Sequence, residues 1–251
     1  INLNFGLQAY YPFSGNANDQ SGNANHGSTF GSPTLSSDRF GYLNSAYEFD
    51  GIDDFSNTFS TFDYADRSLS LWVKPYDLTG SGPTAKVALT QDNNAINYGT
   101  SRVSFENGQM NLWAGGNTGN YSTSSVDTSF WLHLVLIRDG SQTKYFVNNA
   151  LVYTSSSNGT GSTVNPNSNM IIGSGRRTIN QFFKGKIDDV RIYNRVLNIC
   201  EIHALFSGST IDLDAGLQAH YPFSGKANDQ SGNANHGSTF GSPTLSSDRF
   251  G

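Results

Sequence analysis

The chain has 251 residues, of which 36% are hydrophobic and 13% aromatic, which is enough to bury a substantial core and excludes a disordered protein. Only 14% are charged, and much of the polar remainder is glycine, serine, threonine and asparagine, which suit turns and strands better than helices. A formal charge of −5 and scattered basic residues argue against nucleic acid as a partner, and no apolar run is long enough for membrane insertion.

One cysteine, Cys200, cannot form an internal disulfide, so we expect stability to come from the core, a metal or assembly. The chain begins without a methionine or a leader, which is typical of a mature product or a fragment. Together these features favour an all-β extracellular or cell-surface protein.

Short apolar runs with period-two alternation, bounded by Gly, Asn, Asp, Ser or Pro, predict eleven strands. In chain order they are 7–13, 45–49, 68–74, 86–91, 101–106, 110–115, 130–138, 144–147, 150–154, 170–173 and 183–193. Asn148 and Asn149 are expected to form a tight hairpin turn, because asparagine tolerates positive φ. A helix is expected only at 198–206, where Ile199, Ile202 and Leu205 form an apolar stripe.

The sequence contains a long internal repeat. Residues 1–41 recur as 211–251, and only five of the 41 positions differ, so 36 are identical. The differing pairs are Asn2 and Asp212, Asn4 and Asp214, Phe5 and Ala215, Tyr10 and His220, and Asn16 and Lys226. We therefore expect a β-sandwich repeat at 1–210 and the start of a second, incomplete repeat at 211–251.

The second copy has apolar residues without a partner sheet of its own. One hypothesis is that 211–251 fills, in a neighbouring copy, the place that 1–41 occupies. The alternative is an unused tail at a chance boundary.

Several segments, in this order, carry a family resemblance: GLQAYYPFSGNANDQSGNANHG, SAYEFDGIDDF, LSLWVKP, FWLHLVLIRDG with KYFVNNALV, and FKGKIDDVRIYNRVLNICEIHALF. Over residues 6–207 the chain resembles the laminin-G-like jelly rolls of the concanavalin A-like lectin/glucanase superfamily. The resemblance implies a two-sheet antiparallel jelly-roll sandwich with one short C-terminal helix.

A structural Ca²⁺ is expected, because calcium takes six to eight oxygen ligands and carboxylates beside an Asn/Gly/Asp loop supply them. Asp188 and Asp189 are predicted to face the loop that carries Asp19 and Asn23. The resemblance further implies Asp188 as the anchor, with Asp50 and the carbonyl near Gly51 as additional ligands. The alternative is that Asp19 and Asn23 only cap turns while Asp189 faces solvent or pairs with Arg191.

No catalytic set is expected. Glu48, Asp50 and Asp53 lack the one-face spacing of a glucanase pair, and no histidine or cysteine has the spacing of a metal site or a nucleophile. Trp113, Tyr98 and Tyr121 lie among Asn and Gly and are candidates for a sugar-binding platform, with ordinary sheet packing as the alternative for Trp113.

Two functions are consistent with these patterns. The first is a non-catalytic repeat module of an extracellular fibre or adhesin, whose partners are other copies of itself in an array. The second is a carbohydrate-binding module of a larger secreted protein, with cell-surface glycans as partners.

Overall fold

A computed structural model describes residues 1–91, 101–114, 121–123, 125–140, 142–155, 168–175, 180–208 and 217–247. The chain divides into two compact units, Ile1–Ser209 and Thr210–Gly251. This division coincides with the repeat boundary within one residue.

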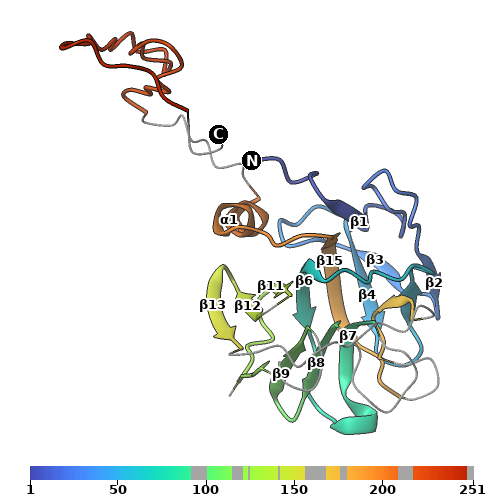
Figure 1. Cartoon of the computed structure of the whole chain (residues 1–251). Helices are drawn as coiled ribbons and strands as arrows, with labels where there is room; N and C mark the ends of the chain where they lie inside the picture. The colour runs from blue at the N-terminus through green and yellow to red at the C-terminus, as the bar shows by residue number, and fades with distance from the viewer. Residues whose placement is uncertain are drawn as a thin grey trace. The chain divides into compact units, whose positions relative to one another are not determined.

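The first unit consists almost entirely of strands (Figure 1). The strands are β1 (Leu7–Tyr11), β2 (Ser28–Phe30), β3 (Thr34–Ser36), β4 (Ala46–Asp50), β5 (Phe55–Asn57), β6 (Asp66–Pro75), β7 (Lys86–Gln91), β8 (Ser101–Glu106), β9 (Gln109–Trp113), β10 (Tyr121–Ser122), β11 (Leu132–Asp139), β12 (Thr143–Val147), β13 (Ala150–Thr154), β14 (Met170–Ile172) and β15 (Lys184–Tyr193). A 3₁₀ turn, η1 (Gly82–Thr84), and a helix, α1 (Ile199–Ser207), complete the described elements.

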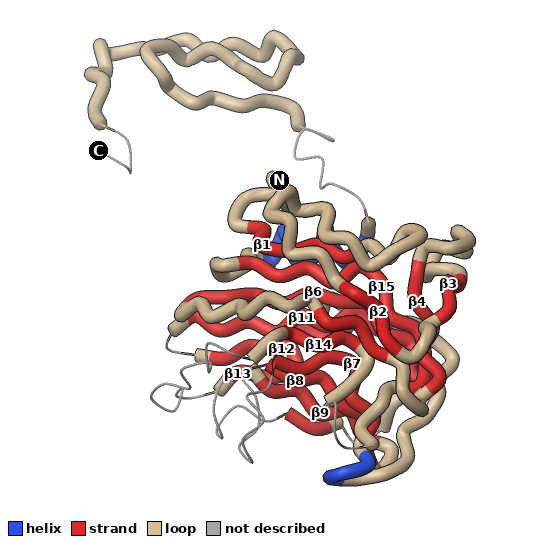
Figure 2. The backbone as a smooth tube through the Cα atoms, turned by 90° about the vertical axis from the view of Figure 1, so that its right-hand side faces the viewer, coloured by secondary structure: helices blue, strands red, loops and turns tan. Residues whose placement is uncertain are grey.

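The strands form two antiparallel sheets that pack face to face (Figure 2). The eight-stranded sheet has the order β13-β12-β11-β6-β15-β4-β3, and β1 also pairs with β15. The seven-stranded sheet has the order β10-β9-β8-β7-β14-β5-β2. This arrangement is the jelly-roll sandwich that the sequence predicts.

The main core lies between the sheets and follows from period-two alternation along each strand. In β6, Leu71 and Val73 face inward, as do Leu134 and Leu136 in β11. The residues between them face outward, where Val135 and Ile137 form part of a second apolar cluster. The eight-stranded sheet is therefore buried on both faces over its centre.

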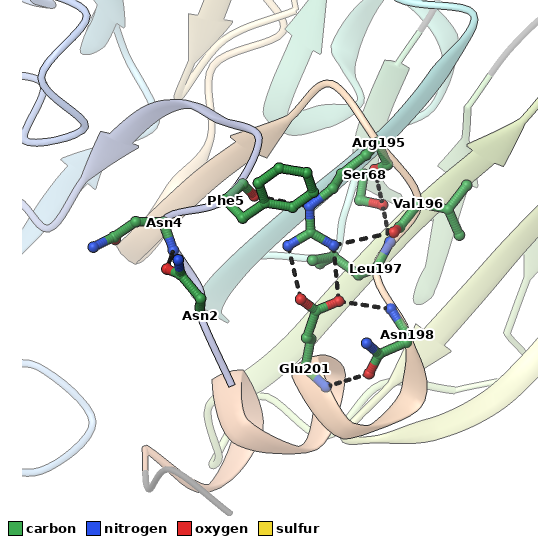
Figure 3. A network of polar contacts seen from close by, with 9 residues as sticks. All are labelled: Asn2, Asn4, Phe5, Ser68, Arg195, Val196, Leu197, Asn198 and Glu201. Carbon is green, nitrogen blue, oxygen red and sulfur yellow. Dashed lines mark hydrogen bonds and ion pairs between the residues drawn. The ribbon is translucent and has the colours of Figure 1, made fainter. Parts of the chain in front are cut away.

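Helix α1 covers part of that outer face (Figure 1), since Ile202 and Leu205 pack on Val135 and Ile137. Asn198 caps the helix by accepting a hydrogen bond from the Glu201 backbone, and the Glu201 carboxylate accepts one from the Asn198 backbone. Both carboxylate oxygens of Glu201 also accept from Arg195, at 2.8 and 2.7 Å (Figure 3).

The same arginine fastens the N-terminal segment to the sheet. Its Nε donates to the carbonyl of Phe5 at 2.8 Å, and its guanidinium lies 5.1 Å from the centre of the Phe5 ring (Figure 3). Residues 1–6, β15 and α1 are therefore joined through one side chain.

All eleven predicted strands are present, with ends that differ by a few residues. The predicted hairpin turn is confirmed, because Asn148 and Asn149 have φ of 48° and 66° between β12 and β13. The predicted helix is also present, at Ile199–Ser207. Four strands were missed: β2, β3, β5 and β10 have only two or three residues, too few to show a period.

The second unit repeats the local structure of residues 7–37 without strands among its described residues. His220 N donates to Asp229 Oδ1 at 2.8 Å, as Tyr10 N does to Asp19 Oδ1 in the first unit. The conformation of the 220–229 loop is therefore determined by hydrogen bonds within the second unit. Its aromatic residues are not covered: Phe223 is 62% exposed, whereas Phe13 is fully buried.

Candidate functional site

The site is built on a β-bulge in the central strand β15. Its pairing with β6 shifts between Asp188, opposite Trp72, and Arg191, opposite Ser70. Ile187 and Val190 both face the core, so the extra residue lets Asp188 and Asp189 lie together on the outer face. Asp189 adopts a φ of +50°, in the left-handed region that aspartate tolerates better than most residues.

Arg39, from the loop after β3, neutralises this pair of carboxylates. Its Nη1 lies 2.8 Å from Asp188 Oδ2, and its Nη2 lies 2.7 Å from Asp189 Oδ2. All three side chains are mostly buried, so solvent screens these ion pairs weakly.

Tyr10 in β1 and Arg191 in β15 complete the network. The Tyr10 hydroxyl donates to Asp189 Oδ1 at 2.7 Å, and the Arg191 guanidinium lies 4.1 Å from the centre of the Tyr10 ring. Arg191 Nη2 also lies 3.3 Å from Asp189 Oδ1. Asp189 therefore has three partners, and Asp188 has one arginine.

This difference in partners gives the carboxyl groups of Asp188 and Asp189 different pKa values. Burial, followed by the charge of Asp189, raises the pKa of Asp188 above its usual range, although Arg39 opposes the rise. Burial tends to raise the pKa of Asp189, but Arg191, Arg39 and the Tyr10 hydrogen bond together outweigh it and hold the pKa below the usual range. Asp189 is therefore the more readily ionised acid of the pair.

Beneath Arg39 lies a buried aromatic stack. Its guanidinium is 4.6 Å from the centre of the Trp72 ring, which packs on Phe206 of α1 at 5.7 Å and 11°. His133 lies 4.9 Å from Trp72, and its Nε2 is 2.9 Å from Ser70 Oγ. The stack gives the site a rigid floor.

A short loop holds two aromatic rings at the rim. Asp38 Oδ1 accepts from the backbone of Phe40 at 2.9 Å and of Tyr42 at 2.8 Å. The two rings lie 6.4 Å apart and remain 58% and 68% exposed. Local hydrogen bonds and the buried Arg39 thus hold this loop in place, and the rings of Phe40 and Tyr42 remain exposed to solvent.

Between this loop and the bulge is an open pocket of about 250 Å³. Its lining includes Tyr10, Asp38, Tyr42, Asp188 and Asp189. Exposed aromatic rings beside buried hydrogen-bonding groups are the chemistry that orients a sugar, since ring faces pack on its CH groups and polar groups bind its hydroxyls.

The residues predicted to bind calcium lie in three places. Asp19 accepts four hydrogen bonds within its loop, from Tyr10 N, Ser21 N and Oγ, and Asn25 N, while the Asn23 amide donates to the carbonyls of Leu7 and Gln8. These hydrogen bonds order the loop and join it to β1. Asp188 and Asp189 both form ion pairs with Arg39, and Asp189 also forms one with Arg191.

Asp50 and Gly51 lie elsewhere, because Asp50 pairs with Lys184, four residues and therefore about 13 Å along β15 from Asp188. There the carboxylate oxygens of Asp50, Asp53 and Asp54 lie within 4.8 Å of one another. Asp54 is buried, and burial raises its pKa, to which the charges of Asp50 and Asp53 add. A hard cation fits this set, so Ca²⁺ stays a prediction, now centred on these three acids.

Trp113 and Tyr121, the described residues of the predicted aromatic platform, do not form an exposed platform together. Trp113, at the end of β9, is only 7% exposed, and Tyr121 packs on Tyr153 at 6.1 Å. Tyr98 lies outside the described residues. Phe40 and Tyr42 have the exposure expected of a platform, and sequence reasoning missed both.

Comparison with protein families decides the affiliation. The family model that describes the concanavalin A-like lectin/glucanases superfamily matches residues 50–203, more than half of the chain. The chain belongs to this superfamily. No curated protein sequence gives a significant match.

Several solved structures have a similar sandwich at low sequence identity. Domain 4 of AbnA, an extracellular arabinanase of Geobacillus stearothermophilus solved with arabinotriose, is 22% identical, with a TM-score of 0.63 over 79% of this chain and 97% of that one. The binding domain of Paraclostridial Mosquitocidal Protein 1 is 16% identical, with a TM-score of 0.61 over 82% of this chain and 53% of that one. Trypanosoma rangeli sialidase with sialic acid is 17% identical, with a TM-score of 0.61 over 80% and 33%. These likenesses establish the fold.

Proposed function

We propose that the first unit is a non-catalytic module of a secreted or surface protein that binds neutral oligosaccharides at the pocket between the 38–44 loop and the β15 bulge. The observation that carries this proposal is the fixed aromatic pair, Phe40 and Tyr42, exposed beside the polar pocket. Arabinotriose in the similar AbnA domain supports a saccharide as the ligand class.

The charges of the pocket favour neutral over acidic sugars. Asp38, Asp188 and Asp189 contribute three carboxylates, against the guanidinium groups of Arg39 and Arg191. Both arginines are already paired with Asp188 and Asp189, so neither guanidinium group is available to pair with a sugar carboxylate.

The same pairing supports a binding role without catalysis. Glycosidases hold two carboxyl groups on either side of the scissile bond, one as acid and one as base or nucleophile. Here Asp188 and Asp189 are adjacent on one strand, and Arg39 bridges them. Neither is free to act as a nucleophile.

The test is a saccharide array probed with the full chain and with Tyr42→Ala. We expect neutral saccharides to bind to the full chain. The substitution should lower their affinity about tenfold or more, as the loss of an aromatic contact does. Phe130→Ala is the matched control, because Phe130 is 67% exposed and absent from the pocket lining. Equal loss in both variants, or preferential binding of sialylated saccharides, would contradict the proposal.

A second candidate role, adhesion through a tandem array, follows from the near-identical repeat. Weak saccharide contacts on linked modules add as avidity, so the two roles are compatible. Exchange of 211–251 between copies stays a prediction; β1 already fills the place beside β15, so exchange must displace it. Comparing the oligomeric state of the full chain with that of a chain ending at Thr210 tests it.

A further inference from the structure

The five positions at which the two repeats differ are unequally placed in the fold. Four of them, Asn2, Asn4, Phe5 and Asn16, are exposed in the first unit. Tyr10 alone is half-buried, and it alone of the five lines the pocket.

The rest of the pocket wall within the repeat is unchanged. Residues Pro12, Ser14, Asp38, Arg39 and Phe40 line the pocket, and the second repeat has the same residue types at 222, 224, 248, 249 and 250. Only Tyr10 is replaced, by His220.

Tyr10 does two things that a histidine side chain cannot do together. Its hydroxyl reaches Asp189 Oδ1 at 2.7 Å, and its six-membered ring supports Arg191 at 4.1 Å. An imidazole is smaller and ends nearer the backbone. It therefore leaves Asp189 Oδ1 free of the tyrosine hydrogen bond and enlarges the pocket beside the bulge.

We infer that residue 10 determines the specificity of this pocket, and that a pocket with histidine at this position, the residue that the second repeat carries as His220, selects different saccharides from one with Tyr10. This inference rests on the saccharide binding proposed above. With tyrosine, Asp189 is occupied by the protein and the pocket is shallow. With histidine, the same carboxylate accepts hydrogen bonds from a ligand, which favours saccharides with an added hydroxyl or amino group at that point.

The experiment transfers the residue of the second repeat into the first. A saccharide array at one pH is probed with the wild-type full chain, Tyr10→His, Tyr10→Phe and Asn16→Lys. Asn16→Lys is the matched control, because it is also a second-repeat residue but lies outside the pocket lining. Thermal unfolding of each variant confirms that it is folded.

We expect Tyr10→His to change the ratio of affinities for the two best saccharides about tenfold or more, while Asn16→Lys leaves the ratio unchanged. Tyr10→Phe keeps the ring but removes the tyrosine hydrogen bond to Asp189 Oδ1, so it should shift the ratio in the same direction by less. If Tyr10→His is folded and binds saccharides like the wild type, with the same ratio of affinities, this inference is wrong while the proposed function stands. Binding by neither protein would overturn it together with the proposed function.

Discussion

Arg39 and Asp188 form a 2.8 Å ion pair across 149 residues of sequence. Through this contact a surface loop carrying two exposed aromatic rings is fixed to a bulge in the central strand of the larger sheet. The position of the 38–44 loop therefore depends on the bulge in β15, and the pocket depends on both.

Replacing Arg39 by alanine should lower the free energy of unfolding by about 3 kcal/mol, because it leaves two buried carboxylates without their shared cation. Urea denaturation measures the change. Lys144→Ala is the control, since Lys144 and Asp139 form a more exposed pair at 3.5 Å and should contribute less than about 1 kcal/mol. Similar losses in both variants would show that the Arg39 pair is not buried as described.

His133 should make the protein sensitive to mild acid. Burial, with Arg39 and Arg191 nearby, lowers its pKa to about 3, whereas an unfolded histidine titrates near 6.5. Below about pH 6.5 the unfolded chain binds a proton that the folded protein does not, so stability falls as the pH falls towards 3, by up to about 1.4 kcal/mol per pH unit.

Urea denaturation of the wild type and of His133→Gln between pH 7 and 5 tests this, because the contributions of other groups, including Asp188 with its raised pKa, are common to both proteins. His133→Gln should lower the slope of stability against pH by about one proton relative to the wild type. The same slope in both proteins would mean that His133 is accessible to solvent and titrates normally.

Glu201 should be more important for stability than an ordinary helix residue. Its carboxylate accepts two hydrogen bonds from Arg195 and one from the Asn198 backbone. Glu201→Gln keeps the shape but removes the charge, and we expect a loss of about 1–3 kcal/mol in unfolding free energy. Wild-type stability in this variant would show that the link between α1 and the N-terminal segment contributes nothing.

Calcium should raise the melting temperature if the acids after β4 bind it, because a ligand that binds only the folded state stabilises it. Asp53→Asn should abolish the shift, whereas Asp63→Asn, a change at an exposed acid outside the cluster, should not. A shift that survives Asp53→Asn but disappears in Asp188→Asn would place the ion at the bulge. No shift in the wild type would refute the calcium prediction.

The sandwich was predictable because its long strands are apolar runs and their turns carry Gly, Asn or Asp. Even the left-handed turn at Asn148 and Asn149 follows from residue type. The short strands were not predictable, because β2 and β5 are recognisable only from their pairing with each other and with β14.

The site was only partly predictable. Asp188 and Asp189 stood out as a pair, but strand alternation would place neighbours on opposite faces, and only the bulge brings both outward. Arg39 gave no signal, since its partners are distant in sequence. The run Phe40-Gly41-Tyr42-Leu43 after Asp38 was available as a clue, because apolar residues in a turn imply exposed rings.

The most direct test of the central claim is to map a bound neutral saccharide by NMR on the isotopically labelled full chain. We predict that the largest chemical-shift changes fall on Phe40, Tyr42 and the backbone of Asp188 and Asp189. Changes confined to β9 and β10, around Trp113 and Tyr121, would contradict the assignment and return the binding site to the platform first predicted from the sequence.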